Sequence, residues 1–458
     1  MNKLLLIATS VMMFGGINAL AEETKQDTIR IYDHVVFYDG YRMADNPDSL
    51  VNDGILRHSC SLYSRPLTDE QLNALGDSLQ LNVFVHACCD NYDRIGNINL
   101  AFVPKGEETY DPWQTDRIEI GRFITPFMNK NKEPSTVPYA YEMNYMSTIL
   151  RDKSLRENYD LWLEFELFGV PYAANEQVAG CAGRSDVFAG TLEFVTNVPE
   201  AGSADESILV PIVIKKPEYI GANLNNYTEE GTDEMGKTIK TYTFVVPEDA
   251  TDSQIVLITS NHGANAFGEE YNRRWHYVYF DDELVLSYKP GRESCEPFRV
   301  YNTQANGIYG YTSMSDLEWQ SFSNWCPGDV IDNRIIKLGA MTAGEHKVTI
   351  RVPDAKFFGK QGDIPVSMYF HGLREGEFPA AVSQPVAEPR LSINLENESL
   401  KVTADSDIIS VELYSLKGEL LYRQWGSKAI PVRWQHGQVY VLCVELNDGM
   451  TVAKKIVL

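Results

Sequence analysis

The sequence predicts an all-β protein built from antiparallel β-sandwiches, and three observations support that prediction. Short runs of alternating apolar and polar residues dominate the chain, and this period of two is typical of half-buried strands. Aromatic residues make up 11% of the 458 residues, and aromatic side chains are enriched in strands. Helical periodicity is scarce, whereas many short strands separated by turn residues are typical of sandwiches.

The N-terminus has the pattern of a secretory signal peptide. Lys3 is followed by an apolar run from Leu4 to Met13, and Ala19–Ala21 forms an A-x-A-like cleavage site. We therefore expect residues 1–21 to be removed and the protein to be exported, to the periplasm, the cell surface or the medium. No later run approaches the roughly 18 apolar residues of a membrane helix, so we expect no integral membrane segment.

Alternating runs predict strands along the whole mature chain. The clearest are 81–85, 161–167, 241–246, 276–280 and 346–352. Two short helices are also expected. Thr68 and Gln71 form a capping-box pattern at the start of one, and the other covers about Tyr145 to Arg151.

Two segments, 197–207 and 375–389, are predicted to be linkers because they are rich in small residues, Pro and Glu. They divide the chain into an N-terminal domain (22–200), a second domain (208–374), a linker (375–390) and a C-terminal domain (391–458). The last domain is short, alternates through turns at Lys417–Gly418 and Asn447–Gly449, and is expected to be a small Ig-like β-sandwich.

The net charge limits the class of ligand, and the cysteine content bears on disulfide formation. A net charge of −24 argues against nucleic acid, whose phosphates attract Lys and Arg surfaces, and fits a neutral ligand. Disulfides are plausible in an exported chain, but the seven cysteines are an odd number, so at least one is left over. Spacing alone does not determine which cysteines pair. The seven are Cys60, Cys88, Cys89, Cys181, Cys295, Cys326 and Cys443.

Three places combine carboxylates with aromatic or Arg neighbours. Asp93 lies between Tyr92 and Arg94, Glu164 and Glu166 alternate with apolar residues, and Glu270 precedes Tyr271. Carboxylates in unlike environments can divide the work of base and acid in hydrolysis. These places are therefore the candidate sites of chemistry.

Three short blocks resemble the peptide:N-glycosidase F family. Cys89–Arg94 is similar to the family motif Cys-Asp-x-Trp-Asp-Arg, with Tyr92 in place of Trp, and Ile118–Phe127 and Asn324–Gly328 match further blocks. The resemblance implies two adjacent jelly-roll sandwiches with an active site between them. It also implies hydrolysis of the bond between asparagine and N-acetylglucosamine in N-linked glycoproteins or glycopeptides, with no metal ion or organic cofactor. His-Glu-x-x-His and glycine-rich phosphate loops are absent from the sequence.

The resemblance also assigns residue roles. It makes Asp93 the primary catalytic residue, with Arg94 and Tyr92 holding substrate. Glu270 takes the place of a second family carboxylate, and Tyr271 stands where the family has Trp.

Further carried-over roles concern the strand 161–167 and two loops. Glu166 matches a third catalytic carboxylate, although Glu164 lies on the same face and remains an alternative. Phe168, His262 and Trp325 are expected to contact substrate. Cys295 and Cys326 match a family disulfide. Phe322 departs from the family, which has Arg there.

The C-terminal domain resembles the sorting domain of the type IX secretion system of Bacteroidetes, through its glycine turn, Gly437–Tyr440 and a basic, apolar end. This implies the secretion machinery as a partner. The alternative is an ordinary Ig-like accessory module.

Two other functions remain open. A non-catalytic carbohydrate-binding or adhesin protein on the same scaffold would keep the aromatic residues without needing Asp93 ionised. A copper monooxygenase would need clustered His and Met ligands, whereas the eight histidines are scattered. We expect a monomer.

Overall fold

The fold was obtained from a computed structural model. The structure describes residues 26–42, 53–198, 207–214, 223–224, 233–263, 268–304, 323–358, 362–374, 392–396, 399–404, 408–415, 420–426, 430–431, 439–446 and 451–457. The expected signal peptide (1–21), the linker (375–390) and Phe322 lie outside these residues. No helix in the described part of the chain is long and apolar enough to cross a membrane.

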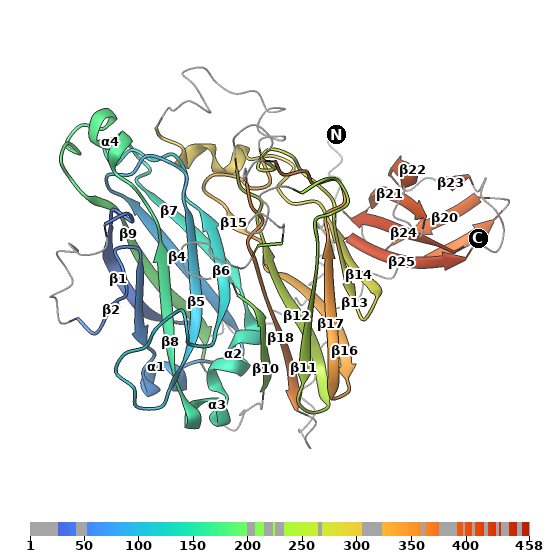
Figure 1. Ribbon diagram of the computed structural model, residues 1–458, viewed down its shortest axis with the longest axis horizontal. Coiled ribbons are helices and arrows are strands. Elements are labelled where there is room, and N and C mark those ends of the chain that lie inside the picture. The colour runs from blue at the N-terminus through green and yellow to red at the C-terminus, as the bar shows by residue number, and fades with distance from the viewer. Residues whose placement is uncertain are drawn as a thin grey trace, which may run out of the picture.

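The first half of the chain forms an antiparallel sandwich of two sheets (Figure 1). One sheet has the order β1 (Gln26–Tyr38), β9 (Asp186–Asn197), β4 (Leu79–Ala87) and β7 (Thr136–Glu142). The other has the order β15 (Val330–Ile331), β6 (Arg117–Ile124), β5 (Ile95–Pro104), β8 (Tyr159–Leu167), β3 (Leu62–Pro66) and β2 (Leu56–Arg57).

The period of two in the sequence accounts for the core of this sandwich. In β4, Leu79, Leu81, Val83 and Val85 are fully buried, and the residues between them are less so. Successive side chains of a strand point to opposite faces, so one face of β4 enters the core and packs with residues such as Phe165 of β8.

A second sandwich follows, with a hydrophobic core of its own. Its sheets have the orders β10 (Ser207–Val213), β18 (Val366–Arg374), β12 (Ala250–Thr259), β16 (Arg334–Met341), and β11 (Ile239–Val246), β17 (Gly344–Arg351), β13 (His276–Phe280), β14 (Glu283–Tyr288). The two sandwiches lie side by side (Figure 1). The short strand β15, from the second half of the chain, pairs with β6 of the first sandwich, Ile331 opposite Arg122.

The C-terminal residues form a third, smaller β unit beside β13 and β14 (Figure 1). Its sheets have the orders β19 (Ser392–Glu396), β20 (Ser399–Thr403), β23 (Ile430–Pro431), and β22 (Leu420–Trp425), β21 (Ile408–Ser415), β24 (Val439–Leu446), β25 (Thr451–Val457). Trp275 and Tyr414 meet edge to face between this unit and the second sandwich, at 6.5 Å between ring centroids. The predicted all-β class is confirmed.

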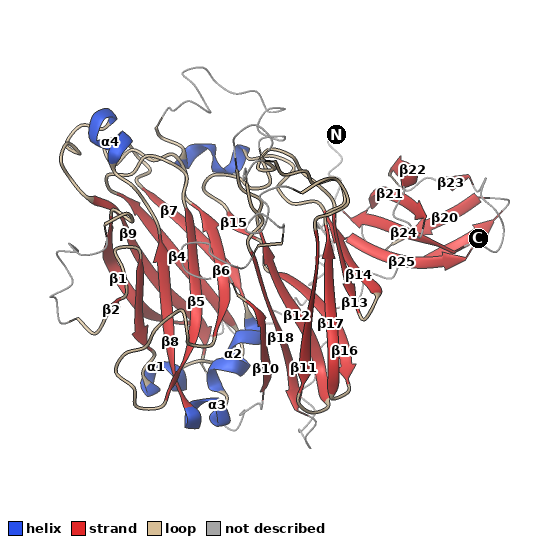
Figure 2. Cartoon of the chain, in the orientation of Figure 1, coloured by secondary structure: helices blue, strands red, loops and turns tan. Residues whose placement is uncertain are grey.

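Helices are short and lie at the ends of the first sandwich (Figure 2). Both predicted helices are present: α1 (Asp69–Asn73), with the complete capping box from Thr68, and α2 (Asn144–Arg151). Three others were not predicted: α3 (Lys153–Asn158), α4 (Tyr172–Gln177) and the 3₁₀ helix η3 (Glu296–Tyr301). Six residues are too few to show a helical period in the sequence.

Candidate active site

The loop between β4 and β5 brings Tyr92, Asp93 and Arg94 to the edge of the first sandwich. Its first part is fixed by a disulfide between Cys89 and Cys181. This pairing was not predicted, because the two residues are 92 positions apart and spacing alone does not specify connectivity. The disulfide ties the loop to the segment that follows α4.

Asp90 holds the loop in shape from inside. Its buried carboxylate accepts hydrogen bonds from Nε of Arg94 at 2.7 Å, from the backbone N–H of Tyr92 at 2.9 Å and from that of Val170 at 2.7 Å. Burial raises the pKa of Asp90, although these partners oppose the rise. The guanidinium of Arg94 is thereby held 5.5 Å from the ring centroid of Tyr92, a cation–π arrangement.

The second sandwich contributes Glu270 from the segment between β12 and β13. The backbone N–H of Gly263 donates to its carboxylate at 2.8 Å, and the Asn324 side chain donates to its backbone carbonyl. Trp325 is fixed in turn by a hydrogen bond from its indole N–H to the carbonyl of Asn261 at 3.1 Å. The Glu270 loop and the Trp325 loop therefore hold each other.

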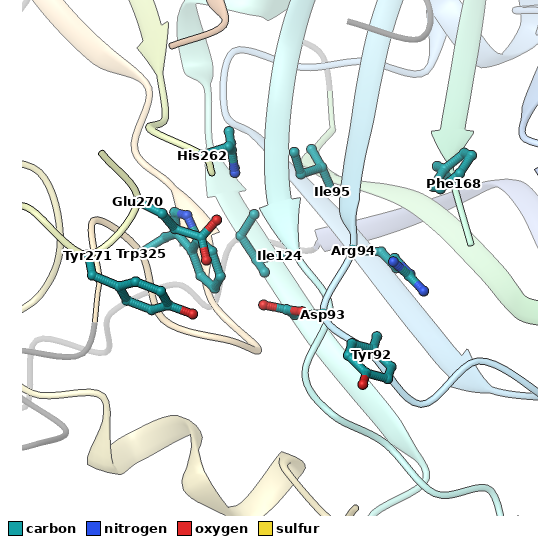
Figure 3. Close-up of a pocket in the computed structure, with 10 residues that line it drawn as sticks. All are labelled: Tyr92, Asp93, Arg94, Ile95, Ile124, Phe168, His262, Glu270, Tyr271 and Trp325. Carbon is teal, nitrogen blue, oxygen red and sulfur yellow. The ribbon is translucent and has the colours of Figure 1, made fainter. Parts of the chain in front are cut away.

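A cavity of about 360 Å³ lies where these loops meet. Its walls are Tyr92, Asp93, Arg94, Ile95, Ile124, Phe168, His262, Glu270, Tyr271 and Trp325. The side chain of Asp93 points across the cavity toward the side of Glu270 and Tyr271, and Phe168 lies at the far end beyond Arg94 (Figure 3). Clefts between domains are favoured ligand sites.

The two carboxylates of the cavity have raised pKa values. Burial, and secondly the charge of Glu270, raises the pKa of Asp93 to about 7. Burial also raises the pKa of Glu270, against hydrogen bonds from Gly263 and Tyr271. Burial and the nearby carboxylates raise the pKa of Tyr271, so its hydroxyl remains a hydrogen-bond donor near neutral pH. A carboxylate that titrates near 7 is suited to general base catalysis.

The structure brings eight of the nine predicted catalytic and substrate-binding residues to this cavity and leaves one outside it. Glu166 lies on β8, two residues before Phe168, and is buried opposite Asn97 of β5. Glu166 does not line the cavity, and its catalytic role stays a prediction. Ile95 and Ile124 were not predicted, because apolar strand residues give no chemical signal in a sequence.

Glu164, the alternative to Glu166, belongs to a separate buried cluster. Its carboxylate accepts hydrogen bonds from Arg117 at 2.7 Å, from Tyr110 at 2.8 Å and from Asn99 at 2.9 Å. These contacts satisfy a fully buried carboxylate, as burial of a charge requires. They give Glu164 a structural position in the first sandwich.

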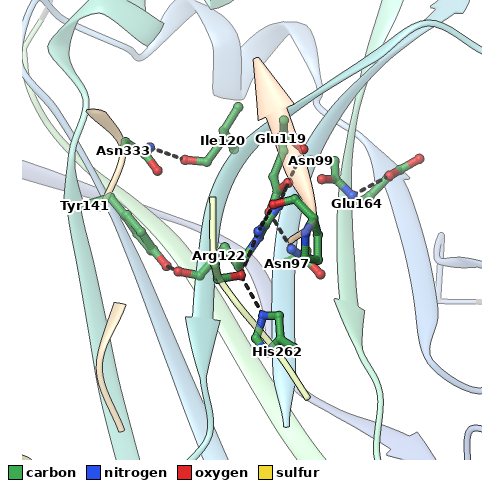
Figure 4. Close-up of polar contacts among 12 residues, drawn as sticks. Asn97, Asn99, Glu119, Ile120, Arg122, Tyr141, Glu164, His262 and Asn333 are labelled. Carbon is green, nitrogen blue, oxygen red and sulfur yellow. Dashed lines mark hydrogen bonds and ion pairs between the residues drawn. The ribbon is translucent and has the colours of Figure 1, made fainter. Parts of the chain in front are cut away.

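Arg122 joins the two sandwiches close to His262 (Figure 4). Its fully buried guanidinium pairs with Glu119 at 2.8 Å and donates to Ser260 Oγ at 2.8 Å and to the carbonyl of Pro365 at 3.0 Å, both in the second sandwich. Ser260 Oγ is also 2.7 Å from Nε2 of His262, which lines the cavity. Arg122 lies on the fully buried strand β6.

The Cys295–Cys326 disulfide implied by the family resemblance is present. It lies in a small apolar cluster with Trp325, Ile124 and Ile258, so it anchors the loop that carries Trp325. Cys88 and Cys443 keep free thiols. In the described part of the chain, no group of three or more His, Cys, Asp or Glu side chains could hold a metal ion.

Comparison with known proteins identifies the family of the chain. Residues 28–182 match the family model of the N-terminal domain of peptide-N-glycosidase F, and residues 230–371 match that of its C-terminal domain. The chain belongs to the peptide-N-glycosidase F family. No match was found among curated protein sequences.

Two solved structures of PNGF-II show a similar fold. A structure of PNGF-II in space group P21 is 17% identical, with a TM-score of 0.51, over 77% of this chain and 66% of that one. A second crystal form, C2, is 15% identical, with a TM-score of 0.50, over 78% and 66%. This chain therefore spans just under two thirds of the length of PNGF-II. The glycosylasparaginase PNGase F from Flavobacterium meningosepticum is 14% identical, with a TM-score of 0.49, over 77% and 97%.

Proposed function

We propose that the protein is an exported amidase that hydrolyses the bond between asparagine and N-acetylglucosamine in N-linked glycoproteins or glycopeptides. The main support is the position of Asp93 and Glu270, which come from different sandwiches and line one cavity. Family membership supports the same chemistry. The glycan would leave as a glycosylamine, which then loses ammonia, and the asparagine would become aspartate.

Asp93 is the group proposed to attack or to activate water. The reaction needs a base for the attacking oxygen and a proton for the departing amine. A pKa of about 7 leaves Asp93 ionised in a large part of the molecules at neutral pH and still basic enough to accept a proton. The carboxyl of Glu270 is proposed to orient the water or polarise the leaving group.

The remaining cavity residues are proposed to hold the core sugars. Tyr92, Tyr271, Phe168 and Trp325 offer aromatic surfaces, and Arg94 and His262 offer hydrogen-bonding groups. Glu166 does not line the cavity, so its proposed contribution is to tune these groups from β8 and not to touch the sugar. The signal-peptide pattern and the two disulfides support export, and the C-terminal domain is the proposed signal for the secretion machinery.

A purified high-mannose glycopeptide incubated with the mature protein in ¹⁸O-labelled water tests the proposal. Mass spectrometry should show release of the glycan and conversion of asparagine to labelled aspartate. Asp93→Asn should abolish release, whereas Glu248→Gln, in an exposed ion pair with Arg374, should not. Absence of release from high-mannose and complex-type glycopeptides, with glycan binding retained, would refute the amidase and favour the carbohydrate-binding alternative.

A further inference from the structure

An exposed aromatic surface continues the cavity beyond Phe168. Tyr41 and Tyr172 are 69% and 56% exposed, far more than is usual for residues that fill a core. The rings of Tyr41 and Phe168 meet edge to face at 5.3 Å between centroids, and those of Tyr41 and Tyr172 lie nearly parallel at 6.4 Å. We call Phe168, Tyr41 and Tyr172 the aromatic shelf.

The aromatic shelf is built from three segments that hold one another in place. Tyr41 follows β1, Phe168 follows β8 and Tyr172 begins α4. The backbone N–H of Gly40 donates to the carbonyl of Gly169 at 2.9 Å. A Cβ at Gly40 would be 2.4 Å from the Phe168 ring, so only glycine allows this close approach.

Two further contacts fix the ends of the shelf. The buried carboxylate of Asp39 accepts a hydrogen bond from the backbone N–H of Tyr41 at 3.2 Å. At the other end, Ala174 of α4 and Val178, which follows the helix, pack on the Cys89–Cys181 disulfide. Rings held this way lose little conformational freedom when a ligand binds.

We propose that the aromatic shelf is a second glycan subsite, which binds sugars beyond the core disaccharide. This inference rests on the proposed function, which places the bond to be cut beside Asp93. Phe168 lies at the end of the cavity away from Asp93 and Glu270 (Figure 3), so a glycan that extends from the reacting bond toward Phe168 would reach the shelf. In this orientation the peptide, which is attached at the reacting bond, would leave the cavity from the carboxylate end.

The chemistry of the shelf fits sugar rings better than a peptide. Tyr is a rigid residue with a broad apolar face and a polar tip, which gives contact area at a low entropic cost, and such faces can cover the apolar C–H face of a pyranose. The nearby guanidinium of Arg42, which is 3.5 Å from the Asp39 carboxylate and 59% exposed, can donate to sugar hydroxyls.

The test compares two glycopeptides with the same peptide, one carrying only the core disaccharide and the other an oligomannose glycan. The quantity measured is the ratio of kcat/KM for the long glycan to that for the short one. The double variant Y41A/Y172A is expected to lower this ratio about tenfold, because each lost ring contact costs a factor of about three. Y41F/Y172F, which keeps both rings, and W113A, an exposed aromatic on another loop, should leave the ratio unchanged.

Two results would overturn the shelf as a glycan subsite. One is an unchanged ratio in Y41A/Y172A; the other is a loss that follows the length of the peptide and not that of the glycan. Calorimetry with the free oligomannose glycan separates this proposal from the amidase activity. If no substrate is cleaved, binding by the wild type that is lost in Y41A/Y172A still supports the subsite, and absence of binding by the wild type refutes it.

Discussion

Asp93 and Glu270 come from different sandwiches and line the same cavity, and the charge of Glu270 contributes to the raised pKa of Asp93. Each sandwich supplies only one of the two carboxylates, so neither sandwich can form the site alone. The relative position of the two sandwiches therefore determines whether the two carboxylates share one cavity.

The pH dependence of activity should follow Asp93. Its pKa of about 7 predicts that kcat/KM rises with pH, is half-maximal near pH 7 and levels off at higher pH, because the ionised form acts on the substrate. Steady-state rates of glycan release across pH 4–9 measure this rise and its plateau. A rate that is flat between pH 5 and 8 would contradict ionisation of Asp93 as the controlling step.

The same shift predicts a pH-dependent stability. The folded pKa of Asp93, about 7, lies above the ordinary pKa of an aspartate, so the folded state binds the proton more tightly, and stability falls as pH rises from about 4 to 7. Asp93→Asn removes this cost. Its free energy of unfolding should exceed that of the wild type by about 2 kcal/mol or more above pH 7, and the gain should shrink toward pH 4. Urea unfolding at several pH values measures the difference, and equal gains at pH 4 and 8 would count against it.

Removing the charge of Glu270 should lower the pKa of Asp93. Glu270→Gln takes away the second-largest cause of the shift, so the residual rate should reach its plateau at a lower pH than in the wild type. The measurement is the pH–rate profile of the variant at high enzyme concentration. Glu248→Gln, remote from the cavity, provides the control, and a profile that does not move would exclude coupling between the two carboxylates.

Arg122 should be critical for stability. Arg122→Met leaves the buried carboxylate of Glu119 without its ion-pair partner and removes two hydrogen bonds to the second sandwich. Breaking a buried ion pair costs about 3–5 kcal/mol of unfolding free energy. Arg374→Met, which removes an exposed pair, should cost less than about 1 kcal/mol. Denaturant titration gives both values; similar losses in the two variants would show that burial is not decisive.

The two disulfides should contribute different amounts to the free energy of unfolding. Cys89–Cys181 closes a loop of 92 residues and Cys295–Cys326 one of 31. In the chain-entropy model, closing the longer loop adds about 1 kcal/mol more to the free energy of unfolding than closing the shorter one. Chemical unfolding of the paired Cys→Ser variants should show this order, and the reverse order would point to enthalpic differences between the two sites.

Local sequence patterns were enough to predict the sandwiches and most of the cavity. The alternation in β4 specifies one buried face wherever the strand pairs, and the capping box at Thr68 is satisfied within four residues. In β8, by contrast, both faces are buried from Leu161 to Leu167. Asp93 and Glu270 could be singled out because a carboxylate beside aromatic and Arg residues is unusual, and because short family motifs surround them.

Other features depended on the folded chain. Two of them join residues that are distant in the sequence: the Cys89–Cys181 disulfide and the pairing of β15 with β6. A third is the position of Glu166, which lies outside the cavity. The sequence by itself determined which faces are apolar and which residues can carry charge, because those are local properties. Only the tertiary structure decided which carboxylates share one cavity, because the packing of one sandwich against the other sets that distance.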